Sequence, residues 1–243
     1  MKSDIEKETV FLKKNCVVLF SGGIDSTTAL HWALRRSKDV QALTFDYGQR
    51  HKIEVRLAGI AARKLCVPRT VLKIDFGQVG GSALTDPAIR LPRYKKLSEL
   101  RPGPPATYVP FRNGVLLAFA AAWSEARSIH EIVCGFNIFD SPDYPDTRPE
   151  FVRAMERAVN TGTKAAFGGS RMKITAPFIQ MKKSDIIRWG LAHGADYSYS
   201  VSCYAGSEIP CGTCSSCLWR ERAFAEAGAP DPLIERLGRR RKS

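Results

Sequence analysis

A loop of glycine and serine follows the first apolar run of the chain. It reads Ser21-Gly22-Gly23-Ile24-Asp25-Ser26, comes directly after the apolar residues 16–20, and opens a helical pattern that continues to residue 36. Two glycines let a backbone turn sharply and approach a ligand closely, and a helix start offers unpaired N–H groups and a positive dipole end. This order of strand, loop and helix predicts an anion site, although a purely structural Gly-Gly turn gives the same order.

Short apolar runs and helical patterns alternate along most of the chain. The expected strands cover residues 16–20, 40–45, 71–74, 131–136 and 172–175. The expected helices cover residues 26–36, 51–65, 112–126, a stretch from 149, and 184–193. This alternation predicts an α/β fold with a doubly wound, Rossmann-like parallel sheet that binds ligands at the carboxyl ends of its strands. Residues 76–108 lack periodicity, which is typical of a binding loop.

Composition and charge narrow the class of protein. The chain is 44% hydrophobic and 25% charged, as globular proteins are, and no apolar run reaches the roughly 18 residues that span a bilayer. Residues 1–14 lack the pattern of a secretion signal, so we expect a cytoplasmic protein. The net charge of +13 suits attraction to the phosphates of nucleotides or of nucleic acid. Arg239, Arg240, Arg241 and Lys242 contribute to it from an expected flexible tail.

Four of the seven cysteines form a dense group near the C-terminus. Cys211, Cys214 and Cys217 are separated by two-residue gaps, and Cys203 precedes them. In a reducing compartment such a group indicates a metal site rather than disulfides. Four thiolates indicate closed, structural Zn²⁺ coordination, and an iron–sulfur cluster stays open as an alternative. The other three cysteines lie in apolar segments and are expected in the core: Cys16, Cys66 and Cys134.

The exact string of the phosphate loop separates it from other nucleotide loops. It lacks the Gly-Lys-Ser/Thr ending of a Walker loop and is not a dinucleotide fingerprint. It resembles the Ser-Gly-Gly-x-Asp-Ser motif of the PP-loop ATP pyrophosphatases, whose fold is of the adenine nucleotide alpha-hydrolase type. Those enzymes cleave ATP to AMP and pyrophosphate and activate a carbonyl oxygen as an adenylate. The resemblance implies bound ATP and Mg²⁺, and Lys183 sits where such enzymes keep a lysine that contacts pyrophosphate.

Further strings extend the resemblance over residues 15–233. They are Phe20–Thr28, Leu43–His51, Pro105–Asn113, Tyr144–Phe151, Thr161–Lys164 and Ser202–Tyr204. With the cysteine group they resemble the 7-cyano-7-deazaguanine (preQ0) synthase family of queuosine biosynthesis. The resemblance implies a ligase that adenylates 7-carboxy-7-deazaguanine on its carboxylate, lets ammonia displace AMP to give an amide, and activates the amide with a second ATP to form the nitrile. It also implies a homodimer.

The resemblance implies roles for individual residues and a division of the chain. The expected catalytic residues are Asp25, Ser26, Lys183 and Arg112. The expected ATP contacts are Phe20, Ser21, Gly22, Gly23, Ile24, Asp25, Ser26, Thr27, Thr28, Thr44 and Phe45. The expected substrate contacts are Gln49, Arg50, Asn113, Asn137, Tyr144, Asp146 and Arg148, with His51 a weaker candidate. Residues 15–195 are expected to form the ATP-binding domain and 196–235 a four-cysteine zinc subdomain, with flexible tails at 1–14 and 236–243.

One segment departs from the pattern of the family. Where the family usually reads Asn-Ala-x-Asp-Tyr-Ser-Gly-Tyr-Pro-Asp-Cys-Arg, residues 137–148 read Asn-Ile-Phe-Asp-Ser-Pro-Asp-Tyr-Pro-Asp-Thr-Arg. This loop is expected to face the deazaguanine. A paralogue that stops at the amide, or that joins the carboxylate to an amine of a protein or nucleic acid, therefore stays open.

Two further classes of protein remain as alternatives. A PP-loop tRNA thiolation enzyme would suit the basic charge and the cysteines, but it would require an RNA-binding domain for which we expect no room. A zinc-ribbon nucleic-acid binder without enzymatic activity would leave the phosphate loop without a purpose, and its aromatic residues would be interleaved with the basic ones for stacking.

Overall fold

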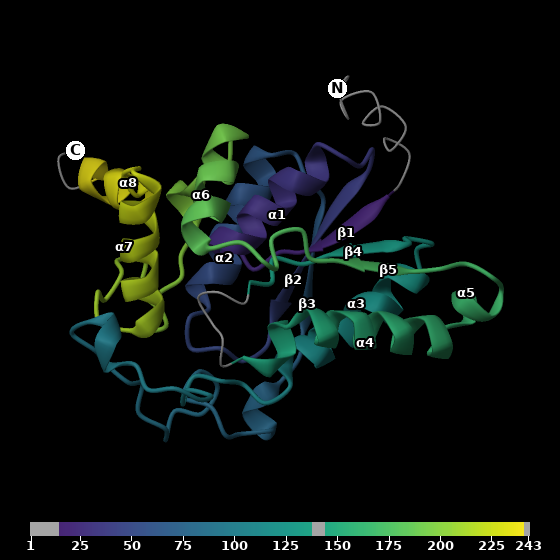
Figure 1. Cartoon of the computed structure of the whole chain (residues 1–243), viewed down its shortest axis with the longest axis horizontal. Coiled ribbons are helices and arrows are strands. Elements are labelled where there is room, and N and C mark those ends of the chain that lie inside the picture. Colours follow the sequence, from purple (N-terminus) through teal and green to yellow (C-terminus); the bar gives the residue numbers. More distant parts are fainter. Residues whose placement is uncertain (1–14, 138–143, 241–243) are drawn as a thin grey trace.

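Five parallel strands form one sheet at the centre of the molecule (Figure 1). The computed structural model describes residues 15–137 and 144–240. The strands are β1 (Cys16–Leu19), β2 (Val40–Asp46), β3 (Arg69–Lys73), β4 (Glu131–Val133) and β5 (Lys173–Thr175). Their order is β3-β2-β1-β4-β5, and every neighbouring pair is parallel. The chain therefore reverses its direction of winding between β1 and β4, which confirms the predicted doubly wound sheet.

Helices connect the strands and continue beyond the last one. They are α1 (Ile24–Leu34), α2 (Ile53–Lys64), α3 (Arg112–Glu125), α4 (Pro149–Gly162), α5 (Lys164–Phe167), α6 (Lys183–Ala192), α7 (Ser215–Ala227) and α8 (Pro232–Arg240). Single 3-10 turns lie at Phe76–Gln78, Leu97–Glu99, Pro145–Thr147 and Tyr197–Tyr199. The five predicted helices correspond to α1, α2, α3, α4 and α6, whereas the sequence patterns did not predict α5, α7 and α8.

Alternate strand residues point to opposite faces of the sheet and build two cores. The first core joins the sheet to α3 and α4 through Val17, Leu43, Ile132, Leu117 and Val152. The second joins it to α1, α2 and α6 through Val18, Ala42, Val133, Leu30, Ala58 and Ile186. Both faces are thus covered by helices, as Figure 1 shows, which explains why the strands read as nearly continuous apolar runs.

The segment after α6 packs on the side of the sheet that α1 and α2 cover. Tyr197 and Phe224 share a core with Ile24 of α1. Leu233 of α8 and the buried cysteines share another core with Leu57 of α2. The C-terminal segment therefore rests on α2 and on α1, the helix that follows the phosphate loop. The boundary between residues 195 and 196 stays a prediction.

The helix α8 occupies part of the predicted C-terminal tail. Residues 236–240 belong to this helix. Leu237 packs into the core around Leu57, and Nε of Arg236 donates a hydrogen bond of 2.6 Å to the carbonyl of Ser198. These tertiary contacts order a segment whose basic charge alone predicts fraying. The remaining predicted tail residues, 1–14 and 241–243, lie outside the described residues.

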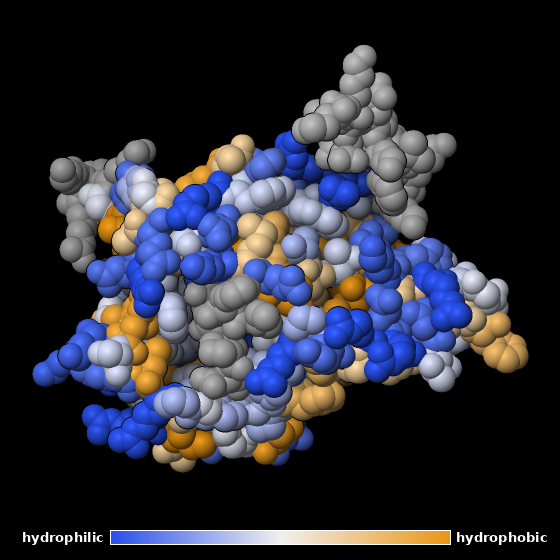
Figure 2. Space-filling view, viewed as in Figure 1, coloured by the Kyte–Doolittle hydropathy of each residue, from blue (hydrophilic) through white to orange (hydrophobic). Residues whose placement is uncertain are grey.

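One face of the molecule is mainly polar. On the face in Figure 2, hydrophilic residues predominate and apolar residues gather in small separate areas. Cys66 was expected in the core but is exposed, because the backbone leaves α2 there with a φ of 54°. Within 15–137 and 144–240, no helix combines the length and apolar character needed to cross a membrane.

Candidate functional site

A cavity of about 820 Å³ lies at the carboxyl edge of the sheet. Its floor comes from residues just beyond three strands, namely Ser21 after β1, Tyr47 after β2 and Gly135 after β4. The predicted binding loop contributes Leu97, Ser98, residues 100–103 and Pro105, and the C-terminal segment contributes a further wall. The cavity therefore occupies the position where the strand order reverses, which is where doubly wound sheets bind their ligands.

Hydrogen bonds from backbone N–H groups to serine hydroxyls stabilise the conformation of the phosphate loop. The N–H of Gly22 donates to Oγ of Ser26 at 3.1 Å, and the N–H of Gly23 donates to Oγ of Ser21 at 3.2 Å. Gly22 has a φ of +84°, and a methyl group on it would lie 2.9 Å from Cβ of Ala58 in α2. Both the backbone angle and the contact with α2 therefore require glycine at this position. The result is a tight turn at the N-terminus of α1, a geometry suited to an anion.

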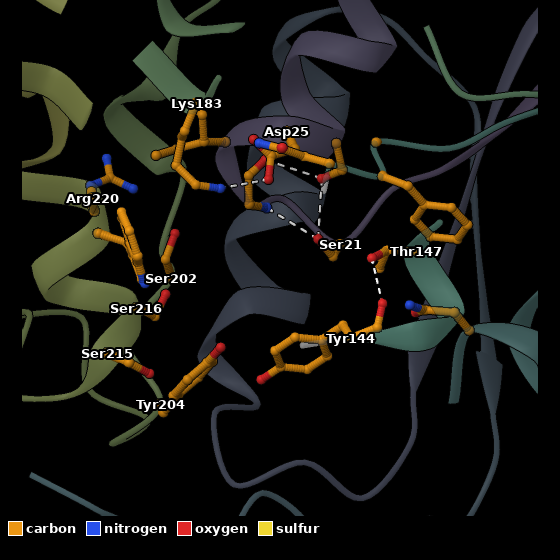
Figure 3. A pocket seen from close by; sticks show the side chains of 18 of the residues that line it. Ser21, Asp25, Tyr144, Thr147, Lys183, Ser202, Tyr204, Ser215, Ser216 and Arg220 are labelled. Atoms are coloured by element: carbon orange, nitrogen blue, oxygen red, sulfur yellow. Dashed lines mark hydrogen bonds and ion pairs between the residues drawn. The ribbon is translucent and has the colours of Figure 1, made fainter. Parts of the chain in front are cut away.

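An ion pair stands beside this loop. Nζ of Lys183, the first residue of α6, lies 2.8 Å from Oδ2 of Asp25 in α1. The other carboxylate oxygen of Asp25, Oδ1, is buried and has no hydrogen-bond partner among the described residues. Figure 3 shows the pair above Ser21 at one end of the cavity. The site thus presents a cationic group for phosphate and a carboxylate oxygen that a metal cation could use.

Gly135 lets the loop after β4 approach the start of α1. A methyl group on Gly135 would lie 2.6 Å from the carbonyl carbon of Asp25 and 2.8 Å from the nitrogen of Ser26. Only a residue without a side chain allows these two backbones to come so close. Gly135 is a site residue that the sequence patterns did not indicate, because it lay inside the expected strand over residues 131–136.

The predicted ATP contacts divide into two groups. Those that line the cavity are Phe20, Ser21, Gly23, Ile24, Asp25, Ser26 and Phe45. Gly22, Thr27, Thr28 and Thr44 do not line it. The hydroxyl of Thr28 donates to the carbonyl of Ile24 at 2.9 Å and lies 2.6 Å from that of Tyr197, and the hydroxyl of Thr44 donates to the carbonyl of Phe20 at 2.7 Å. These two threonines join elements of the fold to one another.

Gln49 and Arg50 were predicted as substrate contacts, but in the structure they form hydrogen bonds that hold loops in place. Gln49 is fully buried, accepts a hydrogen bond from the N–H of Tyr47 at 2.7 Å, and donates to Oε1 of Glu54 at 2.9 Å. Nη2 of Arg50 donates to the carbonyls of Asp86 and Ile89 at 2.7 and 2.9 Å. Neither residue lines the cavity, whereas the neighbouring His51 does.

The other predicted substrate contacts cluster at the start of α3 and in the segment before α4. Asn113, Asn137 and Tyr144 line the cavity, and Asp146 and Arg148 do not. Oδ2 of Asp146 accepts a hydrogen bond of 3.0 Å from the N–H of Asn113, so this carboxylate caps the first turn of α3. Residues 138–143 of the altered loop lie outside the described residues.

The far end of the cavity is aromatic. Nη1 of Arg112 lies 3.3 Å from the hydroxyl of Tyr47, and its guanidinium stacks 5.6 Å from that ring. Burial raises the pKa of Tyr47 to about 12, so its hydroxyl stays neutral. Figure 3 shows Tyr144 and Tyr204 pointing toward one another from opposite walls. Neutral aromatic side chains that line a cavity suit a flat heteroaromatic ligand.

The four cysteines predicted as metal ligands lie together. Their Sγ atoms are all within 4.8 Å of one another, and those of Cys211 and Cys217 are 4.0 Å apart. Tetrahedral bonds of about 2.3 Å from a zinc ion to each sulfur place the sulfurs about 3.8 Å apart. The N–H groups of Cys211 and Cys214 also point at the sulfurs of Cys203 and Cys211, at 3.3 and 3.4 Å. The cluster therefore fits a closed metal site.

The cysteine cluster also shapes the cavity. Ser202 and Tyr204 flank Cys203 and line the cavity, as do Ser215 and Ser216 beside Cys214 (Figure 3). Thr213 accepts a backbone hydrogen bond of 2.7 Å from Tyr94, which ties the binding loop to the cluster. Sequence reasoning assigned the cysteines but not these neighbours, although their position beside the predicted ligands could have indicated them.

Comparison with known proteins gives a consistent result. Residues 15–228 match the family model described as queuosine biosynthesis protein QueC. The chain is 42% identical to a 7-cyano-7-deazaguanine synthase of Nostoc punctiforme, over 90% of this chain and 98% of that protein. It is 45% identical to a synthase of the same name from Azotobacter vinelandii, over 90% of this chain and 97% of the other. Among solved structures, a 4-thiouridine synthetase–RNA complex with bound ATP is similar to this chain at 18% identity, with a TM-score of 0.48. The similarity covers 88% of this chain and 50% of that one, and it supports no further conclusion.

Proposed function

Because the chain belongs to the family of the queuosine biosynthesis protein QueC, we propose that it is a 7-cyano-7-deazaguanine synthase. In this proposal an ATP-dependent carbon–nitrogen ligase converts 7-carboxy-7-deazaguanine and ammonia to the nitrile. The carboxylate is adenylated, ammonia displaces AMP to give an amide, and a second ATP activates the amide oxygen. The supporting observation is one cavity that joins a phosphate loop to an aromatic wall.

The end of the cavity beside α1 would hold the nucleotide. The N–H groups at the start of α1 and the hydroxyls of Ser21 and Ser26 can donate to phosphate oxygens. The ammonium group of Lys183 lies beside them and would stabilise the charge that develops on the leaving pyrophosphate. The unpartnered Oδ1 of Asp25 would bind Mg²⁺, which supplies further charge neutralisation to the phosphates when bound.

The aromatic end of the cavity would hold the deazaguanine. Tyr144 and Tyr204 face one another there, and Asn113 and Asn137 also line the cavity. Flat side chains can stack on a planar base, and amide groups can hydrogen-bond its edge. The guanidinium of Arg112 lines the cavity at this end, beside the hydroxyl of Tyr47, where it could hold the carboxylate for adenylation.

The four cysteines would hold Zn²⁺ in a structural role. All four ligands come from the protein, so no coordination position is left for water or substrate. The ion would fix the segment that carries Ser202, Tyr204 and Ser215 against the cavity. Metal analysis and the visible absorption spectrum distinguish this site from an iron–sulfur cluster, because a zinc site is colourless.

The test is to incubate the full chain with ATP, Mg²⁺, ammonium and 7-carboxy-7-deazaguanine and to follow the products by mass spectrometry. The proposal expects the nitrile together with AMP and pyrophosphate. An amide as the final product would instead support the arrested paralogue, and AMP release with neither product would indicate a different acceptor. Either result would overturn the proposed reaction.

A lysine variant tests the proposed nucleotide end. Lys183→Met should lower the rate of substrate-dependent ATP–pyrophosphate exchange by about 10²-fold to 10³-fold, as loss of one charged donor does in other active sites. The matched control is Lys182→Met, because Lys182 is the exposed neighbour and does not line the cavity. Equal rates in the two variants would contradict the role of Lys183.

We further propose that the protein acts as a homodimer in the cytoplasm. Of these two expectations, the homodimer is the one that rests on the resemblance to the family. Light scattering coupled to size-exclusion chromatography measures the oligomeric state, and a monomer at working concentration would contradict the first of them.

A further inference from the structure

His51 and Glu54 form a polar pair in the wall of the cavity. Nε2 of His51 lies 3.4 Å from Oε1 of Glu54, and both side chains line the cavity. The side chains are only 6% and 12% exposed, respectively. The same Glu54 oxygen accepts a hydrogen bond of 2.9 Å from Nε2 of Gln49, whose own carbonyl is held by the N–H of Tyr47. The carboxylate is therefore fixed in place before it meets the histidine.

This arrangement determines which ring nitrogen of His51 can accept a proton. An ionised carboxylate only accepts hydrogen bonds, so the nitrogen beside Glu54 carries the hydrogen in the neutral ring. The other nitrogen, Nδ1, then has a free lone pair. It is buried and has no hydrogen-bond partner in the part of the chain that the structure describes. A buried polar atom without a partner is costly unless a ligand or a proton uses it.

The surroundings of His51 belong to the acceptor end of the cavity. Its ring packs 6.4 Å from that of Tyr47 and 5.8 Å from that of Tyr204, measured between centroids. The phosphate end is formed by other elements, namely the start of α1 and Lys183 of α6. A base in this position would act on the incoming amine and not on ATP.

The proposed reaction needs such a base, and this inference rests on the proposed function. When the nitrogen of ammonia attacks the carbonyl carbon of the adenylate, a C–N bond forms and the C–O bond to AMP breaks. The nitrogen then carries one proton too many, and the amide forms only after that proton leaves. We propose that Nδ1 of His51 accepts this proton and passes it to solvent, with Glu54 as the residue that orients the ring and stabilises the imidazolium.

The test separates steps that need this proton transfer from steps that do not. His51→Gln should lower the rate of ammonia-dependent amide formation by about 10²-fold to 10⁴-fold, the usual contribution of a positioned base. It should lower ATP–pyrophosphate exchange with 7-carboxy-7-deazaguanine far less, because adenylation precedes attack by the amine. It should also retain hydroxamate formation from hydroxylamine, because the nitrogen of that adduct is more acidic than the nitrogen of the ammonia adduct and loses its proton to water without a base.

Two further variants keep the test informative. His130→Gln is the matched control, because His130 is exposed, precedes β4 and does not line the cavity. Glu54→Gln should give a smaller loss with the same selectivity for ammonia, and it serves if His51→Gln does not fold. The proposal would be overturned if a folded variant lost amide formation, exchange and hydroxamate formation together, or if it lost none of these three activities. If the wild-type protein shows no exchange with 7-carboxy-7-deazaguanine, the proposed function itself fails.

Discussion

Gly135 offers a stringent test of how the phosphate loop is assembled. A methyl group there would lie 2.6 Å from the carbonyl carbon of Asp25, 2.7 Å from its oxygen and 2.8 Å from the nitrogen of Ser26. All three are backbone atoms, so no side-chain rotation relieves the overlap. Ordinary van der Waals contact begins near 3.4 Å, whereas these distances are 2.6 to 2.8 Å. The loop or α1 must therefore move by about 0.6 to 0.8 Å to admit the methyl group.

We expect Gly135→Ala to affect stability and catalysis together. Overpacking of this kind costs about 1–3 kcal/mol of unfolding free energy. A displacement approaching 1 Å at the nucleotide site should lower the rate of ATP–pyrophosphate exchange by about 10-fold to 10²-fold. Urea denaturation followed by circular dichroism measures the first effect, and exchange of labelled pyrophosphate measures the second.

Gly162→Ala is the matched control for this substitution. Gly162 is the last residue of α4, and a methyl group on it would meet nothing within 4 Å. Because alanine favours helix more than glycine does, by about 1 kcal/mol, this variant should be as stable as the wild type or more stable. If Gly135→Ala matched the control in both stability and exchange rate, the close approach of the two backbones would have no energetic importance, and the reasoning would be wrong.

Four more outcomes are expected. Gly190→Ala should lower the unfolding free energy by about 3 kcal/mol in urea, because its methyl group would lie 1.8 Å from the hydroxyl oxygen of Tyr197. Cys214→Ser should lose bound metal by mass spectrometry and melt at a lower temperature than the wild type. Arg220→Met should cost about 3–5 kcal/mol on chemical denaturation, since it leaves a partly buried carboxylate without its bidentate partner. Burial raises the pKa of Tyr47 from 10.0 to about 12, so the unfolded chain loses this proton at a lower pH than the folded protein, and the unfolding free energy falls between pH 10 and 12. Tyr47→Phe should reduce that fall when unfolding is measured as a function of pH.

The sequence alone determined the class of fold and the two anchors of the site. Strands with continuous apolar runs and helices between them predicted a doubly wound parallel sheet, and the sheet order confirms it. The spacing of four cysteines predicted a cluster, and their sulfurs lie within 4.8 Å of one another. These features could be predicted from the sequence because hydrophobic periodicity and the spacing of metal ligands are local properties of the chain. Family membership followed from strings spread over most of its length.

Only the tertiary structure decided which side chains face the cavity. Arg50 and His51 are neighbours in the sequence, yet Arg50 fastens the binding loop while His51 lines the cavity beside Glu54. Thr28 belongs to the phosphate-loop motif, but its hydroxyl meets that of Tyr197, 169 positions away. Gly135 matters because it meets Asp25 at the carboxyl edge of the sheet. Such facts depend on the direction in which each side chain packs and on contacts between distant segments, and no local pattern records either.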